Sequence, residues 1–301
     1  MRKFSEIIII ATLCFVTVGS VVGQFNNQRP GESVYIGTFQ SLARIENRDT
    51  LTSVNLSLHS LPDGFIKKPI EIWPSIKLTP KEIVADLDIQ LGSTEDYAAI
   101  TRGVGYFFKD ANQKILLKKI RWSHWSYDHF IYQNPFSMEV DIYTIKENEE
   151  IKVINGYFDV GKLSQKVFQV KLENSNRIWN ERIHDTMIPL HPLPEDFISK
   201  PKYIWPAIQL TPQGIFAQAD LRITGISTEG IEGATEYLKK LIREANNQIT
   251  IKNMIWMAWW DADGYDKVGI ECEIYIMKDG KEINVGEHMI ESGYAKPYDG
   301  C

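Results

Sequence analysis

The feature that most constrains this chain is an internal repeat, because two copies of one pattern must fold into the same unit twice. A Leu-Pro-x-x-Phe-x-x-x-Pro segment occurs at 61–69 and again at 193–201, an offset of 132 residues. The same offset relates Ile72-Trp73-Pro74 to Ile204-Trp205-Pro206, and Leu78-Thr79-Pro80 to Leu210-Thr211-Pro212. The sequence therefore predicts two homologous domains, a first repeat at 33–165 and a second repeat at 166–298.

The offset between the repeats changes along the chain, which indicates an insertion in the second repeat. Ala85-Asp86-Leu87 matches Ala219-Asp220-Leu221 at an offset of 134, and Trp122 matches Trp256 at the same offset. The offset is 132 again where Ile142-Tyr143 matches Ile274-Tyr275. These matches place two extra residues of the second repeat before Ala219.

Length and charge limit the classes of function. The 301 residues are enough for two domains that each bury a core, and 44% hydrophobic with 24% charged residues is typical of a folded protein. The formal net charge is −6, and the sequence contains no basic cluster. Because nucleic-acid binding relies on a basic face that displaces counterions, a nucleic-acid partner is disfavoured.

The N-terminal segment has the build of a secretory signal peptide. Arg2 and Lys3 precede an apolar run over 7–18, and small residues suited to cleavage end at Gly23. This run is shorter than the roughly 20 residues of a membrane-spanning helix. We therefore expect residues 1–23 to be removed and the protein to be secreted or held in the endoplasmic-reticulum lumen. The alternative is an uncleaved leader that anchors the chain to a membrane. In a secreted chain, Asn55 would be a glycosylation site.

Hydrophobic periodicity predicts an α+β, mostly β fold with one packed helix in each repeat. In the second repeat we expect a helix over 227–247, begun by a Ser or Thr N-cap, with an apolar stripe of Ala234, Leu238, Leu241 and Ile242. A half-buried strand over 268–276, an Asp-Gly hairpin turn and a short helix over 287–292 follow. The matching helix of the first repeat falls near 98–108. A small barrel with a helix packed against it fits this order.

The ordered motifs resemble a known family. The residues that carry the likeness in the second repeat are Leu193, Pro194, Phe197, Pro201, Ile283, Asn284, Val285, Ile290, Gly293, Tyr294 and Ala295. The first repeat keeps Leu61, Pro62, Phe65, Pro69, Ile151, Val153 and Gly161. Each repeat thus resembles the nuclease-like half of an extended Tudor domain, an OB barrel related to staphylococcal nuclease. The resemblance implies two tandem nuclease-like OB barrels after the hydrophobic leader.

Two activities of that family are not expected here. Extended Tudor domains bind methylated arginine through an aromatic cage, and the stretch before the first Leu-Pro segment offers only Tyr35 and Phe39 as cage residues. Nuclease chemistry needs clustered carboxylates for calcium and arginines on the phosphate. Arg121 and Arg222 do not recur, because the sequence match puts Ile255 and Asp88 in their places.

The acidic segment of the second repeat is a candidate metal site. Asp261, Asp263 and Asp266 resemble a calcium loop, but the third ligand and the spaced Glu of an EF-hand are missing. The first repeat has Ser126-Tyr127-Asp128 in the same place. We interpret the segment as a polar turn, with a calcium loop as the alternative.

Tryptophans form the candidate binding residues. Trp125, Trp259 and Trp260 are candidates for a stacking platform, whereas Trp122 and Trp256 recur in both repeats and are interpreted as core. Cys272 aligns with Val140 on an apolar strand face and is expected to be a buried thiol. The alternative for this cysteine is a disulfide with Cys301.

The sequence contains no Ser-His-Asp set, metal-ligand cluster or glycine-rich phosphate loop, and no cofactor is expected. His59 and His191 recur before the Leu-Pro turns and are interpreted as surface or capping residues. The preferred function is a non-enzymatic, secreted or lumenal binding protein with a protein partner. One alternative is a membrane-anchored cytosolic Tudor-like scaffold of germline RNA granules, as the resemblance implies. The other is a divergent metal-dependent nuclease.

Overall fold

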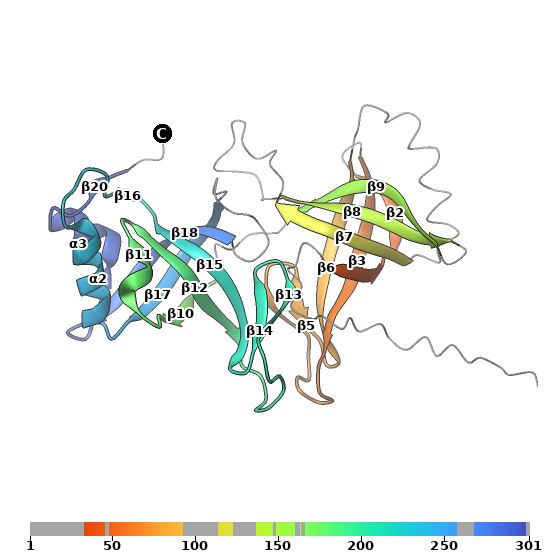
Figure 1. Cartoon of the computed structure of the whole chain (residues 1–301), viewed down its shortest axis with the longest axis horizontal. Coiled ribbons are helices and arrows are strands. Elements are labelled where there is room, and N and C mark those ends of the chain that lie inside the picture. The colour runs from red at the N-terminus through yellow and green to blue at the C-terminus, as the bar shows by residue number, and fades with distance from the viewer. Residues whose placement is uncertain are drawn as a thin grey trace, which may run out of the picture.

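The computed structural model describes residues 33–45, 48–92, 114–122, 137–146, 149–159, 163, 166–257 and 268–298. Strands dominate this part of the chain, and its helices are α2 (Ala234–Glu244), α3 (Val285–Glu291) and the 3-10 turn η3 (Ser175–Arg177), as Figure 1 shows. The predicted mostly β class is therefore confirmed. Within the same residues, no helix has the length and apolarity needed to cross a membrane.

The first repeat supplies one nine-stranded sheet. Its strands are β1 (Val34–Thr38), β2 (Ser41–Ile45), β3 (Arg48–Ser60), β4 (Ile70–Trp73), β5 (Ile76–Leu78), β6 (Glu82–Leu91), β7 (Lys114–Trp122), β8 (Ser137–Lys146) and β9 (Glu149–Asp159). Hydrogen-bonded neighbours run β3-β1-β7-β8-β9-β6, and β6 also pairs with β3. The pairing path thus returns to its first strand, and each strand of the ring has a partner on both sides.

The second repeat supplies another nine-stranded sheet, in which β15 and β18 pair in parallel. Its strands are β10 (Phe168–Lys171), β11 (Ile178–Trp179), β12 (Arg182–His191), β13 (Lys202–Trp205), β14 (Ile208–Thr211), β15 (Gly214–Ile223), β17 (Gln248–Met257), β18 (Val268–Lys278) and β19 (Lys281–Asn284). The short strands β16 (Ile226–Ser227) and β20 (Lys296–Pro297) pair separately. The main path runs β10-β17-β18-β15-β12-β11 and, over the described residues, no pairing closes it.

Strand pairing corrects the position of the insertion between the repeats. Ile76 pairs with Ala85 across β5 and β6, and Ile208 pairs with Ala217 across β14 and β15. The offset is therefore still 132 in β6 and β15. The offset of 134 holds in β7 and β17. The two extra residues consequently lie between β15 and β17, not before Ala219 as the sequence match predicts.

The sequence match fails there because it is two residues out of register. Side chains on a strand have a period of two, so a slip of two residues keeps every side chain on its face and preserves the hydrophobic pattern. In the structure, Asp88 and not Asp86 occupies the position of Asp220. Likewise, Gln90 and not Asp88 corresponds to Arg222.

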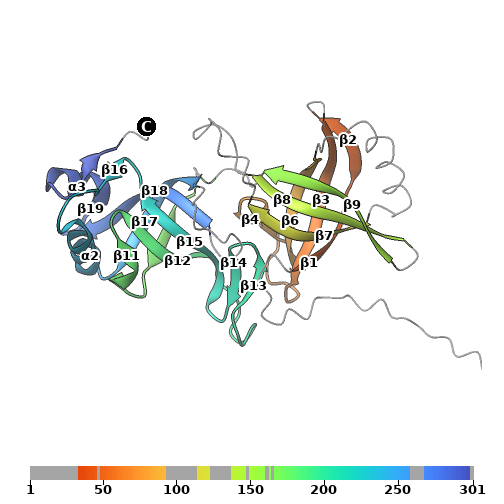
Figure 2. The ribbon, with the colours of Figure 1, turned by 45° about the horizontal axis from the view of Figure 1, so that its top comes forward.

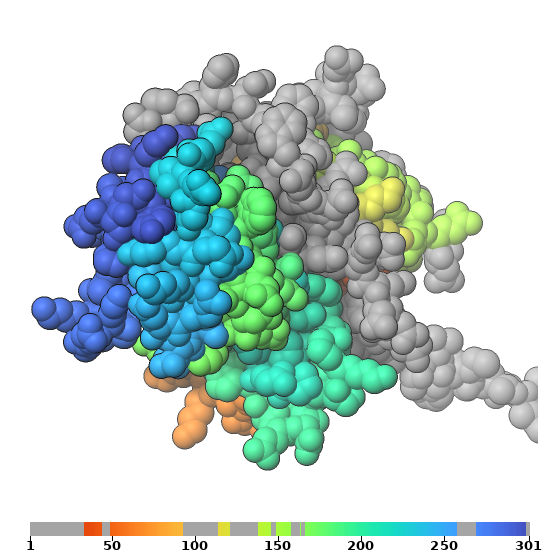
Figure 3. Space-filling model, turned by 60° about the vertical axis from the view of Figure 1, so that its left-hand side comes forward, coloured from red at the N-terminus to blue at the C-terminus, as the bar shows by residue number. Residues whose placement is uncertain are grey.

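Helix α2 begins later than the sequence predicts. Its N-cap is Gly233 in the left-handed conformation (φ 77°), a conformation that glycine adopts without a steric penalty. Thr228, at the predicted start of the helix, instead donates from its hydroxyl to Glu181, with 2.5 Å between the oxygens. The predicted apolar stripe is buried as expected. The helix contacts η3 and β11, and these segments lie side by side at the surface in Figure 3.

The C-terminal hairpin follows the prediction. Asp279 (φ 50°) and Gly280 (φ 76°) form the turn between β18 and β19, as a two-residue hairpin loop requires. Helix α3 then starts two residues earlier than predicted, because the Asn284 side chain accepts the backbone N–H of Glu287 and caps it. On β18, Cys272 is a fully buried free thiol, which confirms that prediction.

Aromatic rings join the two repeats through equivalent contacts. Tyr35 lies edge-on to Trp205 with ring centroids 5.1 Å apart, and Phe168 contacts Trp73 at 6.0 Å. The two contacts are equivalent, because Tyr35 pairs with β7 at the position where Phe168 pairs with β17. In each contact, this aromatic residue of one repeat packs against a tryptophan of the other repeat. Figures 1 and 2 both place the β13–β14 hairpin beside the first sheet. The buried apolar residues accordingly form one cluster across both repeats.

Candidate functional site

A groove of about 720 Å³ runs along the second repeat between β10 and β12 and continues over β14 and β15. Its polar lining includes Gln169, Lys171, Arg177, His184, Asp185 and Gln218. Apolar groups lie among them, and they include Leu172, Ile183, Met187 and Phe216. The groove therefore combines an apolar component with many hydrogen-bonding side chains, as small-ligand and peptide sites do.

A β-bulge in β12 positions the centre of this groove. Asp185 has a left-handed backbone (φ 50°), and its N–H donates to the Asp220 carboxylate at 2.7 Å. The first repeat repeats the arrangement, because Ser53 (φ 49°) donates its N–H to Asp88 at 2.7 Å. In both repeats, a carboxylate thus accepts the backbone N–H that the bulge removes from the strand ladder. We call this hydrogen bond between carboxylate and bulge residue the latch.

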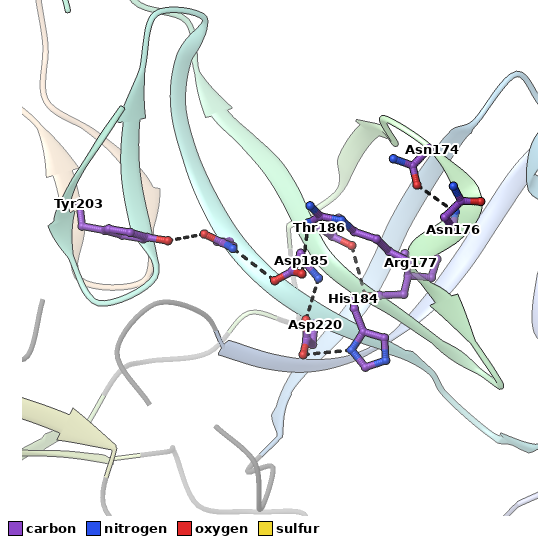
Figure 4. A network of polar contacts seen from close by, with 10 residues as sticks. Asn174, Asn176, Arg177, His184, Asp185, Thr186, Tyr203 and Asp220 are labelled. Atoms are coloured by element: carbon purple, nitrogen blue, oxygen red, sulfur yellow. Dashed lines mark hydrogen bonds and ion pairs between the residues drawn. The ribbon is translucent and has the colours of Figure 1, made fainter. Parts of the chain in front are cut away.

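The second repeat adds a polar network around this latch (Figure 4). Nδ1 of His184 lies 3.2 Å from the Asp220 carboxylate, and Arg177 forms an ion pair of 3.2 Å with Asp185. The amide of Gln218 donates to Asp185 at 3.4 Å and accepts a hydrogen bond from the hydroxyl of Tyr203. The network thus runs from β13 across β15 and β12 to η3.

The first repeat carries different chemistry at the equivalent places. Asp86 stands where the second repeat has Gln218, and Lys77 stands where it has Gln209. Lys77 and Asp86 form an ion pair of 2.6 Å, and this hydrogen bond raises the pKa of Lys77. The second repeat therefore presents neutral amides in place of a charge pair that satisfies itself.

The network is built for hydrogen bonding. Each glutamine amide both donates and accepts, and the Arg177 side chain is 51% exposed, so it is open to a ligand. The hydroxyl of Thr186, the hydroxyl nearest to His184 in the sequence, is buried and donates to the Ile183 carbonyl at 3.3 Å. This hydroxyl is therefore already hydrogen-bonded within the fold. Among the described residues, no group of three or more His, Cys, Asp or Glu side chains is placed to hold a metal ion.

Several predicted site residues lie outside the described residues. These are Trp125, Trp259 and Trp260 of the stacking platform, Asp261, Asp263 and Asp266 of the acidic segment, the leader at 1–23, the helix near 98–108, and Cys301. The side chain of Trp122 is outside them as well. These assignments stay predictions.

Other predicted residues are placed by the structure. Asn55 lies in β3 with an exposed side chain, whose amide donates to the Ser53 carbonyl at 2.9 Å. Trp256 is buried, 7% exposed, and lies edge-on to Trp73 at 5.5 Å, which confirms its core role. His59 and His191 are half-buried in the contact between the repeats, against Phe197 and Phe65, and Nδ1 of His191 lies 2.7 Å from the Pro192 carbonyl oxygen.

The arginine of the second sheet also has a structural setting. Arg222 lies 3.6 Å from Glu181 and 3.9 Å from Glu271, and its guanidinium sits over the Tyr298 ring at 4.8 Å. Its side chain is 13% exposed, so these partners enclose it. The positive charge of Arg222 is thus paired with carboxylates of the second repeat itself.

Sequence reasoning missed the groove. His184, Asp185 and Gln218 occur in the second repeat only. A search for residues that both repeats share therefore does not select them. A detectable signal was the loss of the Lys77 and Asp86 charges, but it needs the correct strand register. The slip of two residues at β15 concealed that exchange.

Comparisons with known proteins add one finding. No family model matches the chain, and a search of curated proteins found no match. The crystal structure of the extended Tudor domain from BmPAPI is similar over 87% of this chain and 98% of that chain, with 11% identity and a TM-score of 0.21.

Proposed function

We propose that the chain is a non-catalytic, secreted or lumenal protein that binds a protein partner through the groove of its second repeat. The observation that carries this proposal is the network of Arg177, His184, Asp185 and Gln218 around an open groove. The first repeat has the same latch without this network, so maintaining the fold does not require these side chains.

The lining favours a polypeptide ligand. Lys171 and Arg177 are balanced by Glu173 and Asp185 along the groove, and glutamine amides match the donors and acceptors of a peptide. A net charge of −6 and the mixed lining offer little to a polyphosphate. The Asp220 carboxylate beside His184 also accepts the N–H of the bulge residue Asp185, and this structural use of the carboxylate supports a binding role over a catalytic one.

The finer fold assignment belongs to the same proposal. Each repeat would be a nuclease-like OB barrel of the extended Tudor type. Support comes from the closed pairing path of the first repeat and from the parallel β15–β18 pair of the second.

Selection from a phage-displayed library of short random peptides tests the binding function. The full chain is immobilised, and enriched peptides are measured by calorimetry. We expect Arg177→Ala and His184→Ala each to weaken binding by about tenfold, with Lys240→Ala on the exposed face of α2 as the matched control. Failure to enrich any peptide, or equal effects of all three substitutions, would overturn the proposal.

A second experiment tests secretion and the absence of catalysis. The leader, and the exposed Asn55, predict a shortened N-terminus and an Asn55-linked glycan that an amidase removes. A retained leader with unmodified Asn55 would favour the anchored cytosolic scaffold. Calcium-dependent nucleic-acid hydrolysis that is lost when Asp261, Asp263 and Asp266 are changed to Asn would favour a nuclease.

A further inference from the structure

Three apolar side chains lie side by side in the lining of the groove. Ile188 of β12 is fully buried, so its two neighbours on the strand point away from the core. Met187 and Pro189 therefore lie on the groove face, and Pro189 pairs with Phe216 of β15. Met187 and Phe216 are half-buried, and Pro189 is exposed. We call Met187, Pro189 and Phe216 the apolar patch.

The first repeat has a more polar surface at the equivalent positions. Its equivalents of the three patch residues are, in the same order, Asn55, Ser57 and Val84. The Ser57 hydroxyl donates to the Glu82 carboxylate, and the Asn55 amide donates to the Ser53 carbonyl at 2.9 Å. These polar side chains are thus hydrogen-bonded within the repeat. The fold therefore does not require large apolar side chains on this face, and the second repeat carries them there.

The border of the patch differs between the repeats in the same sense. Phe216 also pairs with Gln209, and Gln218 follows Phe216 on the groove face of β15. The first repeat has the ion pair between Lys77 and Asp86 at these two positions. Covering an ion pair removes water from two charges, whereas covering amides removes water from neutral groups only. An apolar group can therefore cover this surface of the second repeat at a smaller desolvation cost.

The amide of Gln218 has a fixed orientation beside the patch. The Asp185 carboxylate, which is ion-paired with Arg177, accepts hydrogen bonds, so the NH2 end of the amide faces it at 3.4 Å. The amide oxygen accepts from the Tyr203 hydroxyl (Figure 4). Among the described residues, the second N–H of this amide has no partner. Gln218 therefore offers a hydrogen-bond donor next to an apolar surface.

We propose that the apolar patch binds one large apolar side chain from a segment of the partner protein, and that Gln218 donates to the backbone carbonyl beside it. The inference rests on the proposed function and names what the groove recognises. A groove of about 720 Å³ has room for such a side chain and the adjoining backbone. Methionine adapts its shape to a ligand, and a buried anchor side chain often supplies most of the affinity of an interface.

The test uses the full chain and a peptide enriched by the phage selection. Met187→Asn and Phe216→Val each introduce the residue that the same fold carries in the first repeat. We expect each substitution to weaken binding in calorimetry by about tenfold. Met277→Asn is the matched control, because this methionine is 57% exposed on β18 and does not line the groove. The control should change the affinity by less than about threefold.

A substitution in the peptide tests the contact from the other side. Enriched peptides should share one large apolar residue at a fixed position. Its replacement by alanine should weaken binding to the wild-type chain by about tenfold and to the Met187→Asn chain by less than about threefold. The smaller loss is expected because two groups in contact do not contribute independently. Equal losses with both chains would overturn the inference.

A photocrosslink gives a measurement that does not depend on the folding of a variant. A peptide with a benzophenone side chain in place of its apolar residue is bound to the wild-type chain and irradiated. Mass spectrometry of the digested product should find the crosslink on the fragments that contain Met187 or Phe216. Crosslinks confined to other parts of the chain would contradict the proposed contact.

The outcomes separate this inference from the proposed function. If Arg177→Ala weakens binding and the two patch substitutions do not, groove binding stands and the apolar contact is wrong. If the wild-type chain is a dimer that Met187→Asn makes monomeric, a second copy covers the patch and the inference of a separate partner is overturned. If no peptide binds at all, both proposals fail.

Discussion

The imidazole of His59 lies against the ring of Phe197 with centroids 5.4 Å apart, and Phe65 makes the equivalent contact with His191 at the same separation. Each repeat therefore supplies a histidine and a phenylalanine from equivalent positions to the contact. Such a contact is isologous, like the contact between the subunits of a twofold dimer. The titration of His59 is therefore tied to the packing of one repeat on the other.

This contact predicts that the chain loses stability in mild acid. Burial, with a smaller effect of the Lys202 charge, lowers the pKa of His59 to about 4. The unfolded chain binds this proton near pH 6.5, so stability is fully present above about 6.5 and falls as the pH approaches 4. The slope is at most about 1.4 kcal/mol per pH unit. Urea unfolding at several pH values measures it, and His59→Gln should flatten the curve; an unchanged slope in this variant would refute the assignment.

The interface tryptophan predicts a large loss of stability on truncation. Trp73 is 3% exposed and contacts both Phe168 and Trp256. Trp73→Ala should reduce the free energy of unfolding by about 3–5 kcal/mol. Trp179→Ala is the matched control, because its side chain is 66% exposed and its removal should change stability by less than about 0.5 kcal/mol. Equal effects in urea titrations would contradict the buried position of Trp73.

The close approach at Gly37 predicts that a side chain at this position disrupts the β1–β3 pair of the first repeat. A Cβ atom on Gly37 would lie 2.3 Å from a Leu56 methyl carbon, and Gly37→Val introduces one, as in Val170, the equivalent residue of the second repeat. We expect a loss of about 1–3 kcal/mol and faster hydrogen exchange along the β1–β3 ladder. Ile36→Val on the same strand, where the side chain is 47% exposed, should leave exchange unchanged. Retention of slow exchange in Gly37→Val would contradict the close approach of β1 to β3 at this residue.

The shared latch predicts different costs in the two repeats. Asp220→Ala leaves the N–H of Asp185 without its acceptor in a half-buried site and should cost about 1–3 kcal/mol. Asp88 is exposed, so water replaces it more easily and Asp88→Ala should cost less. Thermal unfolding of both variants gives the order, and a larger effect at Asp88 would count against the latch in β12.

Periodicity predicted those parts of the fold that depend on local pattern. The alternation in β18, the Asp-Gly turn and the stripe of α2 each follow from residues close in sequence. The start of α2 was missed because Gly233 caps the helix through its backbone conformation.

The candidate site was beyond reach of the sequence for a different reason. It depends on Gln218 of β15 lying beside Asp185 of β12, and on a register that a slip of two residues imitates. The docking of the repeats was also unpredictable, because a repeat pattern defines the units and not the surfaces through which they meet.

The reciprocal contact between the repeats has a consequence for how such a chain can evolve. In a homodimer, every substitution appears twice, so a change that benefits one copy must also be tolerated in the other. Covalent fusion of the two copies removes this coupling. Gly37 can be retained in one copy, where it lets β1 pair with β3, while Val170 stands at the equivalent position of the other copy, where β10 and β12 are not paired over the described residues. Duplication followed by fusion thus lets one copy keep its structural role while the other copy acquires a new function.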